Sequence, residues 1–432
     1  MKHILLFGAG KSATVLIDYL KQTAIQKQWL VTIADLNLAA VQAKVGNHEL
    51  LKAVGVSIEN ETERKGLIEQ ADLVISLLPP SMHYVVALDC LAFGKHLLTA
   101  SYVDDKIMEL ADEIKQKNIL FLCEMGLDPG IDHMSAMQLI HRIKDSGGKI
   151  VSFLSHCGGL VAPESDTNPW HYKISWNPRN VVLAGKAGAV YRENSKVKSK
   201  KYEELFADCA EVTIEDLGQL AYYPNRDSLS YIPVYELEET ETFVRTTLRH
   251  PDFCKGWKMV VDLGLTDETN LINTDSLTIS AFLRNAFRGK ESLLSDILAK
   301  DQFDFLGWDD ATLINKGHCS AANVLQFILE KKWVLEENDK DMVVMLHEIE
   351  FIVKSDKLKV KSELVVKGEN NLHTAMAKTV GLPLGIAATL LLEGKINETG
   401  LHIPIIAGIY EPVLKVLAEH GIIFHETEEP SV

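Results

Sequence analysis

Two spacings of apolar residues alternate along the first 125 residues of the chain. Short continuous apolar runs are typical of buried strands, and the stretches between them repeat their apolar positions with the period of an amphipathic helix. The strand-like runs lie at 3–7, 30–34, 55–58, 73–78, 96–99 and 119–123, and the helical stretches lie at 13–20, 39–51 and 105–115. This alternation predicts an α/β fold with a Rossmann-type, doubly wound parallel sheet.

The pattern changes after residue 126. Strands are expected at 150–155, 181–183 and 220–223, and a polar turn at 354–357 joins two further strand-like runs, 342–353 and 358–366, as in a β-hairpin. Helical spacing is found at 132–145, 257–263, 278–287, 292–300 and 321–331. We therefore expect a second α/β domain with a mixed sheet, interrupted by a small all-helical insert.

These patterns divide the chain into three parts. We expect a dinucleotide-binding domain at 1–125, a substrate and dimerisation domain made of 126–250 and 340–394, and the helical insert at 251–339. The tail at 395–432 is expected to return to the first domain, with a helix near 412–419. Its acidic run at 426–429 is most simply a solvated end.

Composition excludes several classes of partner. The net charge of −16 disfavours nucleic acid and anionic membranes. The apolar stretch 380–392 is shorter than the ~20 residues that a membrane span needs, so we expect a buried helix there. Six scattered cysteines show no metal-ligand spacing, so no metal site is expected, and together with the absence of a signal-like start they favour the cytoplasm.

A glycine-rich turn follows the first strand. Gly8, Gly10 and Ala13 form a G-x-G-x-x-A element, in which Lys11 and Ser12 open the next helix. The first glycine permits the turn, the second admits a pyrophosphate, and the helix N-terminus attracts its charge. A P-loop is excluded because it would need glycine at the position of Leu5. Dinucleotide binding is therefore expected here.

The second strand ends in a carboxylate. Asp35 could accept hydrogen bonds from a ribose diol and would repel a 2′-phosphate, and Leu36 supplies no cation, so NAD is expected rather than NADP. The alternative is that Asp35 only caps a helix. Candidate nicotinamide neighbours follow later strands and are Leu78, Pro79, Thr99 and Ser101.

Several longer motifs occur in order across the middle of the chain. They read GLDPGIDH at 126–133, CGGLVAPE at 157–164, NPWHYKISW at 168–176, Pro178-Arg179 and YPNRDS at 223–228. Together they resemble saccharopine dehydrogenases of the glutamate-forming type, over nearly the whole chain. Val161 departs from the proline usual in that family, and Leu36 departs from the basic residue of its fungal NADP-dependent members.

The resemblance implies a homodimer and a reaction. Such an enzyme would oxidise saccharopine to glutamate and α-aminoadipate semialdehyde, with substrate in a cleft between domains. A related enzyme that joins a diamine to an aldehyde, as carboxynorspermidine-forming relatives do, is the first alternative, and its pocket would need carboxylates in place of cations. A dinucleotide sensor without turnover is the second.

Saccharopine carries three carboxylates, so its pocket requires cations, preferably arginines with their bidentate geometry. The candidates are Lys173, Arg179, Arg226 and Arg245. Each could instead form a surface ion pair, and only the surrounding motifs favour Lys173 and Arg226.

Hydride transfer from the substrate requires an unprotonated amine, so a base or an electrostatic partner is needed beside it. By resemblance, Asp128, Tyr102 and Cys157 lie next to the substrate. The alternatives are an ordinary turn for Asp128, a packed ring for Tyr102 and a buried thiol for Cys157. His133 and His171 could also titrate, although structural roles are favoured for both.

Overall fold

The computed structural model describes residues 1–431 of the chain, which divide into two compact units. The first unit comprises residues 1–149 and 372–425, and the second comprises residues 150–371 and those from 426 onward. Residues 126–149 and 372–394, which we expected in the second domain, therefore lie in the first unit. The reason is that their helices, α7 (Ile131–Asp145) and α14 (Ala375–Leu392), pack against α15 (Ala407–Glu419) and α1 (Thr14–Lys27).

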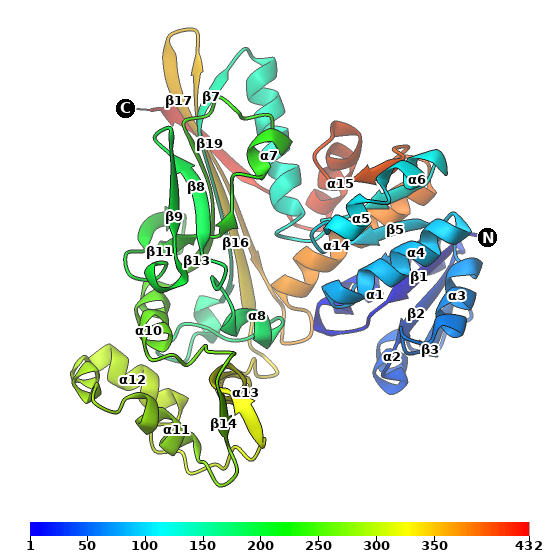
Figure 1. Cartoon of the computed structure of the whole chain (residues 1–432). Helices are drawn as coiled ribbons and strands as arrows, with labels where there is room; N and C mark the ends of the chain where they lie inside the picture. The colour runs from blue at the N-terminus through cyan, green and yellow to red at the C-terminus, as the bar shows by residue number, and fades with distance from the viewer. Residues whose placement is uncertain (432) are drawn as a thin grey trace. The chain divides into compact units, whose positions relative to one another are not determined.

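A seven-stranded parallel sheet forms the centre of the first unit within the described residues (Figure 1). Its strands, in sheet order, are β18 (Gly400–His402), β6 (Leu120–Leu122), β5 (His96–Thr99), β4 (Leu73–Ser76), β1 (His3–Phe7), β2 (Leu30–Asp35) and β3 (Leu51–Gly55). The strands between β1 and β6 are connected through α1, α2 (Leu38–Val45), α3 (Glu61–Gln70), α4 (His83–Phe93), α5 (Asp105–Met108) and α6 (Ala111–Gln116). The central strands are buried on both faces, which explains their unbroken apolar runs.

The apolar helix α14 covers one face of this sheet. By length and composition it could cross a membrane, but 78% of its 18-residue window is buried within the protein. Two glycines allow α14 to approach α1 closely, because a Cβ on Gly381 would lie 3.0 Å from atoms of Leu16, and a Cβ on Gly385 would lie 2.6 Å from the ring of Tyr19. The helix is therefore built as a core element of the first unit.

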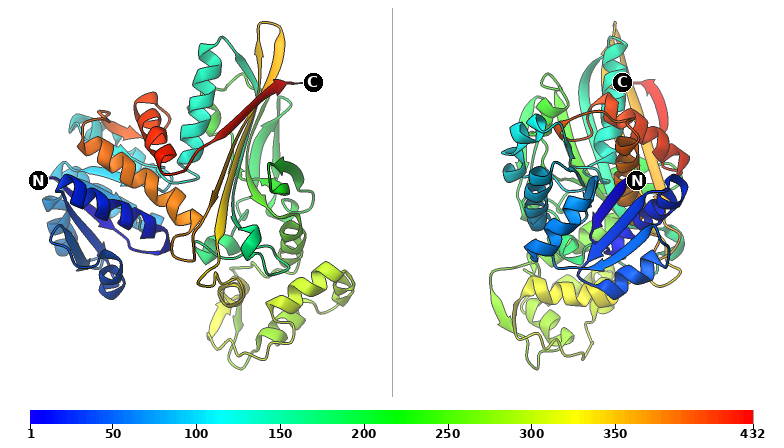
Figure 2. Two further views of the ribbon diagram at one scale, coloured as in Figure 1. Left: turned by 180° about the vertical axis from the view of Figure 1, so that it is seen from behind. Right: turned by 90° about the vertical axis from the view of Figure 1, so that its right-hand side faces the viewer.

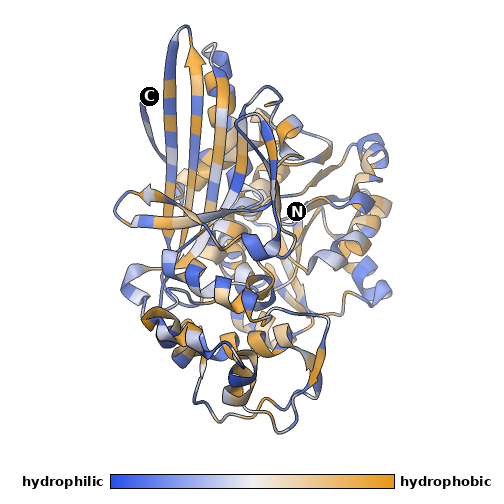
Figure 3. Cartoon of the chain, turned by 60° about the vertical axis from the view of Figure 1, so that its left-hand side comes forward, coloured by the Kyte–Doolittle hydropathy of each residue, from blue (hydrophilic) through white to orange (hydrophobic). Residues whose placement is uncertain are grey.

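The second unit contains a ten-stranded mixed sheet, counted over the described residues. Its central path is β10 (Ala210–Ile214), β11 (Gly218–Pro224), β13 (Thr242–Arg249), β7 (Lys149–Val161), β16 (Asp341–Val353), β17 (Asp356–Lys367) and β19 (His425–Pro430), with β8 (Ala189–Glu193), β9 (Lys196–Lys200) and β12 (Arg226–Asp227) beside it. The long hairpin of β16 and β17 is plain in Figure 2. Figure 3 shows apolar and polar residues interspersed along the strands. Along most of β17 they alternate with the pleat, whereas β16 begins with an unbroken buried apolar run, 342–346.

A helical region follows β13 in the second unit. Its helices are α10 (Pro251–Asp262), α11 (Ile279–Ala286), α12 (Ile297–Leu306) and α13 (Ala321–Lys332), and a two-stranded sheet joins β14 (Leu271–Asn273) to β15 (His318–Ser320). Trp170, Trp257 and Trp333 are fully buried in one core shared by these helices and the neighbouring loops. The fold class predicted from the sequence is confirmed: a Rossmann-type sheet and a second mixed-sheet domain with a mainly helical insert.

Three local predictions are wrong. The third strand lies at 51–55 instead of 55–58, because α2 ends at Val45 and leaves residues 51–55 to pair with β2. The segment expected as a strand at 181–183 instead forms the end of α8 (Pro178–Val182). The side chain of Asn177 caps the N-terminus of this helix by accepting a hydrogen bond from the N–H of Arg179. The acidic run at 426–429 is exposed, as expected of a solvated segment, but it is part of β19, which pairs with β17 in the second unit, and does not return to the first domain.

Candidate functional site

The glycine-rich turn has the conformation that a close backbone approach requires. Gly8 has φ of +99°, and a Cβ there would lie 2.6 Å from the carbonyl oxygen of Leu77. A Cβ on Gly10 would meet nothing within 4 Å, so the space above this residue is open, and Ala13 is buried where helix meets strand. The turn therefore has the glycines that a pyrophosphate needs. Lys11 is exposed and Ser12 half-buried in the short 3-10 turn that follows.

A cavity of about 320 Å³ lies at the carboxyl ends of β1 to β4. Asp35, Leu36, Leu78 and Pro79 line it together with Ile58 and Glu59. Three of these residues are among the predicted cofactor contacts. Ligands of parallel sheets bind at this edge, and the cavity adjoins the turn, so the residues present fit the nucleotide portion of a dinucleotide.

The Asp35 carboxylate binds the turn itself. Its Oδ2 accepts the backbone N–H of Ala9 at 2.8 Å, and its Oδ1 accepts the N–H of Asn37 at 2.9 Å. Asp35 thus holds the loop in place, and both of its oxygens already have protein donors. Helix α2 begins at the next residues and is capped by Asn37, not by Asp35.

A lysine that the sequence pattern did not single out lies against the same turn. The ammonium group of Lys44 donates to the carbonyl oxygens of Ala9 and Gly10, each at 2.8 Å, and to Oγ1 of Thr14 at 3.1 Å. Burial lowers the pKa of Lys44, opposed by the nearby charge of Asp35. A positive charge therefore stands beside the turn without following Asp35 directly in the sequence.

A buried histidine connects two further strand ends. Nδ1 of His83 lies 2.8 Å from Oγ of Ser76, and its Nε2 lies 2.8 Å from Oγ of Ser101. Thr99 is also buried and accepts the N–H of Ser101. Burial lowers the pKa of His83 to about 4, so the ring is neutral at physiological pH. The predicted contacts Thr99 and Ser101 are thus held in a fixed network.

The loops after β5 and β6 hold the predicted residues Tyr102 and Asp128. The hydroxyl of Tyr102 donates to Oδ1 of Asp128 at 3.5 Å, a long contact between two half-buried side chains. Buried hydrogen bonds hold the loop after β6 in place. Nε2 of His133 lies 2.8 Å from Oε2 of Glu124, and Asp132 accepts the N–H of Gly130 at 2.6 Å. His133 is fully buried beside two carboxylates, which supports a structural role for it.

In the second unit, one face of the mixed sheet gathers reactive side chains. Cys157 on β7 and Tyr223 on β11 are both in register with Thr247 on β13, so all three side chains lie on the same face. Arg245 and Arg249 stand two residues before and after Thr247, and hence share that face. Cys157 is 8% exposed, and Arg249 contributes to its electrostatic surroundings.

Arg249 is the most unusual group on this face. Its side chain is buried, its Nη1 donates to the carbonyl of Leu248 at 2.7 Å, and its buried Nε has no hydrogen-bond partner among the described residues. The guanidinium lies 5.3 Å from the ring centre of Tyr172 and 5.5 Å from that of Phe253. No carboxylate in the described chain pairs with it. A buried cation without a counter-ion is a ready site for an anionic ligand.

The predicted cations differ in their surroundings. Arg245 is buried with its guanidinium 4.3 Å from the ring centre of Tyr231. Lys173 is buried, but its charge is matched by Asp339 at 2.6 Å. Arg179 pairs with Glu268 at a partly exposed position, which fits the alternative of a surface ion pair, and Arg226 is exposed on β12 with φ of +49°.

Arg249, His83 and Glu124 were missed from the sequence. An arginine that closes a strand of apolar and threonine residues, just before His-Pro-Asp, is the signal that could have indicated Arg249. No comparable signal marks His83 or Glu124, because their partners are distant in sequence.

Comparisons with known proteins match the chain to one family in two parts. A family model described as "Saccharopine dehydrogenase NADP binding domain" matches residues 4–122, and "Saccharopine dehydrogenase C-terminal domain" matches residues 126–422. The Saccharomyces cerevisiae protein named saccharopine dehydrogenase [NADP(+), L-glutamate-forming] is 34% identical over 98% of this chain and 99% of its own length.

A solved structure is similar over the full length. Apo saccharopine dehydrogenase (L-Glu forming) from Saccharomyces cerevisiae aligns with a TM-score of 0.90 and 32% identity, covering 99% of this chain and 100% of that one. The Arabidopsis thaliana alpha-aminoadipic semialdehyde synthase is 33% identical over 99% of this chain, which spans only 45% of that relative.

These comparisons overturn one expectation. The matching domain is described as NADP-binding and the yeast relative is named for NADP(+), so the prediction of NAD from Asp35 and Leu36 is wrong. The structure gives a physical reason. The Asp35 carboxylate accepts the N–H of Ala9 in the turn and the N–H of Asn37 before α2, so it has a structural role whichever nucleotide is bound. The ammonium group of Lys44 also lies beside the turn, although position 36 is a leucine.

Proposed function

The chain belongs to the saccharopine dehydrogenase family, and from this we propose that it oxidises saccharopine at its secondary amine, giving L-glutamate and L-2-aminoadipate 6-semialdehyde. The observation that carries the proposal is the similarity to a glutamate-forming yeast enzyme over almost the entire length of both chains. The reverse reaction, a reductive condensation, is part of the same proposal.

We propose NADP as the cofactor, which supplies a hydride acceptor when bound. The turn from Gly8 to Ala13 would hold its pyrophosphate through backbone N–H groups, and the cavity beside Asp35 would hold the adenosine portion. Lys44 is the group we propose to compensate the charge of the 2′-phosphate. Its position at the carbonyls of Ala9 and Gly10 supports this role.

The carboxylates of saccharopine would be bound by the second unit. Arg249 is our main candidate, because no carboxylate among residues 1–431 pairs with its buried guanidinium, and Arg245 on the same face is the second. Arg226 is kept as a third candidate, since its exposed side chain stands at the edge strand β12. Lys173 and Arg179 are weaker candidates because Asp339 and Glu268 already neutralise them.

The amine must lose its proton before the hydride leaves. We propose that Asp128 accepts or stabilises this proton, directly or through water, and that the hydroxyl of Tyr102 orients the Asp128 carboxylate. Cys157, a nearly buried thiol beside Arg249, is proposed to line the substrate pocket instead of acting as a base. The hydrolysis of the resulting imine then needs one water near the same carboxylate.

A direct assay tests the proposal. Purified protein is mixed with saccharopine and NADP at alkaline pH, and the absorbance of reduced nucleotide is followed. We expect saccharopine-dependent reduction of NADP and the formation of equimolar glutamate. The absence of reduction would refute the activity. Reduction of the nucleotide only in the presence of a carboxylated polyamine would instead support the diamine-joining alternative.

A further inference from the structure

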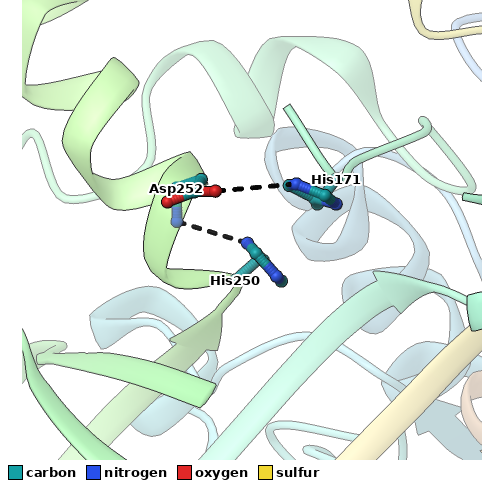
Figure 4. A group of neighbouring side chains, drawn as sticks. All are labelled: His171, His250 and Asp252. Atoms are coloured by element: carbon teal, nitrogen blue, oxygen red, sulfur yellow. Dashed lines mark hydrogen bonds and ion pairs between the residues drawn. The ribbon is translucent and has the colours of Figure 1, made fainter. Parts of the chain in front are cut away.

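Two histidines and an aspartate form a compact cluster at the start of α10 (Figure 4). One ligand atom from each of His171, His250 and Asp252 lies within 4.8 Å of the other two. All three side chains are half-buried. We propose that this cluster is a binding site for a divalent transition-metal ion of the zinc type, with Asp166 as an outer carboxylate.

His171 is oriented as a metal-ligating histidine should be. Its Nδ1 lies 2.5 Å from Oδ2 of Asp166, and its Nε2 faces Oδ2 of Asp252. A carboxylate on one ring nitrogen fixes the tautomer and makes the other nitrogen a better ligand, which is the usual outer arrangement around metal-bound histidines. The pairing with Asp166 therefore leaves the Nε2 lone pair of His171 directed at the cluster.

Asp252 presents its second oxygen to the same point. Its Oδ1 accepts from the ammonium group of Lys255 at 3.0 Å, whereas its Oδ2 lies 3.8 Å from Nε2 of His171. A separation of 3.8 Å is too long for a hydrogen bond. It is close to the roughly 3.3 Å that separates two ligand atoms around a tetrahedral zinc ion with bonds of about 2.0–2.1 Å. A metal ion between these atoms would need only a small inward movement.

His250 completes the set after a rotation of its ring. The two imidazoles are stacked with centres 3.7 Å apart and an angle of 27° between their planes, so their lone pairs do not converge as they stand. Nδ1 of His250 accepts the backbone N–H of Asp252 at 3.2 Å. This is a long hydrogen bond, and metal binding would exchange it for a bond from His250 to the ion.

Asp166 adds a second, independent indication. Its Oδ1 is buried and has no hydrogen-bond partner among the described residues, although its Oδ2 is paired with His171. A buried carboxylate oxygen without a donor is costly. Lys255 pairs with Asp252, and the printed ion-pair partner of Asp166 is His171. With neutral histidines the cluster therefore carries two carboxylates against one ammonium group, and a divalent cation would offset this excess of negative charge.

The donor set defines the class of metal. Imidazole nitrogen with one carboxylate suits zinc, cobalt, nickel or copper, whereas calcium and magnesium prefer oxygen ligands throughout. Three protein ligands leave one tetrahedral position for water or for an anionic ligand.

Zinc binding to the full-length, tag-free chain tests the site. The protein is stripped with chelator and titrated with Zn²⁺ against a chromophoric chelator, and Co²⁺ is used to record ligand-field bands. We expect one tightly bound equivalent per chain. His171→Gly removes a ligand at a position where φ is +50°, a value that glycine adopts freely, so this variant should fold and lose the site.

Matched variants complete the test. Asp252→Asn should also abolish the site, and Asp166→Asn should weaken binding by about 10- to 100-fold. His318→Ala, an exposed histidine on β15 of the same unit, should leave it intact. The proposal is overturned if the stripped protein takes up no zinc, or if His171→Gly and His318→Ala bind zinc equally well. Neither outcome depends on saccharopine turnover.

Discussion

The α-carbon of Gly8 faces the carbonyl oxygen of Leu77 so closely that a Cβ would lie 2.6 Å from it. Gly8 also has φ of +99°, so Gly8→Ala should strain the backbone and destabilise the first unit by roughly 1–3 kcal/mol. Thermal unfolding of the variant measures this. Gly10→Ala is the matched comparison, since Gly10 has an ordinary φ of −63° and open space around it. It should unfold normally but bind NADP weakly, and normal binding would contradict the pyrophosphate site.

Arg249→Met should separate substrate binding from stability. Removing a bidentate partner of a carboxylate should raise KM for saccharopine by at least about tenfold. The melting temperature should stay the same or rise, because an apolar side chain replaces a buried charge that has no protein counter-ion. Steady-state kinetics and thermal unfolding check both parts. Arg179→Met, at a partly exposed ion pair, should change neither, and an equal effect of the two variants would argue against Arg249 as a ligand.

Asp128→Asn should lower kcat with little effect on NADP binding. Loss of a general base costs about 10²- to 10⁴-fold in rate. Tyr102→Phe removes the 3.5 Å contact to Asp128 but leaves the carboxylate in place, so a smaller loss is expected. Rates measured from neutral to alkaline pH provide the check, because a higher pH deprotonates the substrate amine without enzyme help and should partly rescue Asp128→Asn. Full activity of Asp128→Asn at neutral pH would remove it from the mechanism.

His83 should make the first unit sensitive to acid. Burial lowers its pKa in the folded protein to about 4, against about 6.5 when unfolded. The unfolded chain therefore binds the proton first, and stability is full above about pH 6.5 and falls as the pH drops towards 4. The expected loss is on the order of 3 kcal/mol. His83→Gln keeps a donor and an acceptor but cannot titrate, so its denaturant midpoint should vary less over this range. Parallel profiles for both proteins would exclude this role.

Lys44→Met tests the 2′-phosphate assignment. We expect KM for NADP to rise about tenfold or more while KM for NAD changes little, because a surface-accessible ion contact with phosphate is lost only for NADP. Both nucleotides are compared with the same enzyme and saccharopine concentration. An equal loss for both would mean that Lys44 only supports the turn through its bonds to Ala9 and Gly10.

Local sequence patterns predicted most strands of the parallel sheet, but they misplaced its third strand and did not assign residues 126–149 and 372–394 to the first unit. The strands at 3–7 and 96–99 agree with the observed β1 and β5 at both ends, because buried parallel strands have continuous apolar runs. The hairpin of β16 and β17 could also be predicted, since a polar turn at 354–357 separates two long apolar-rich runs. Residues 181–183 were wrongly predicted as a strand because three apolar residues are too few to distinguish helical from strand periodicity. The helical cap at Asn177 favours a helix there.

Sequence patterns could predict only part of the candidate site. The glycine turn is local and could be predicted, whereas the role of Asp35 depends on the backbone of Ala9, 26 residues away. In the sequence, Arg249 cannot be distinguished from any other arginine at the end of a strand. Only the structure shows that its side chain is buried and that no carboxylate among the described residues pairs with it. The metal cluster joins residues about 80 positions apart, so no spacing rule applied to the sequence could connect His171 with His250.

The last strand has a practical consequence for work with this protein. All six residues of β19 are exposed, and three are glutamates, yet the strand occupies the outer edge of β17. Trimming the chain before residue 425 would leave a long ladder of unpaired peptide groups beside alternating apolar side chains. We expect such shortened proteins to aggregate through pairing of their exposed sheet edges. A purification tag fused at this end would need a spacer that leaves the pairing of β19 with β17 undisturbed.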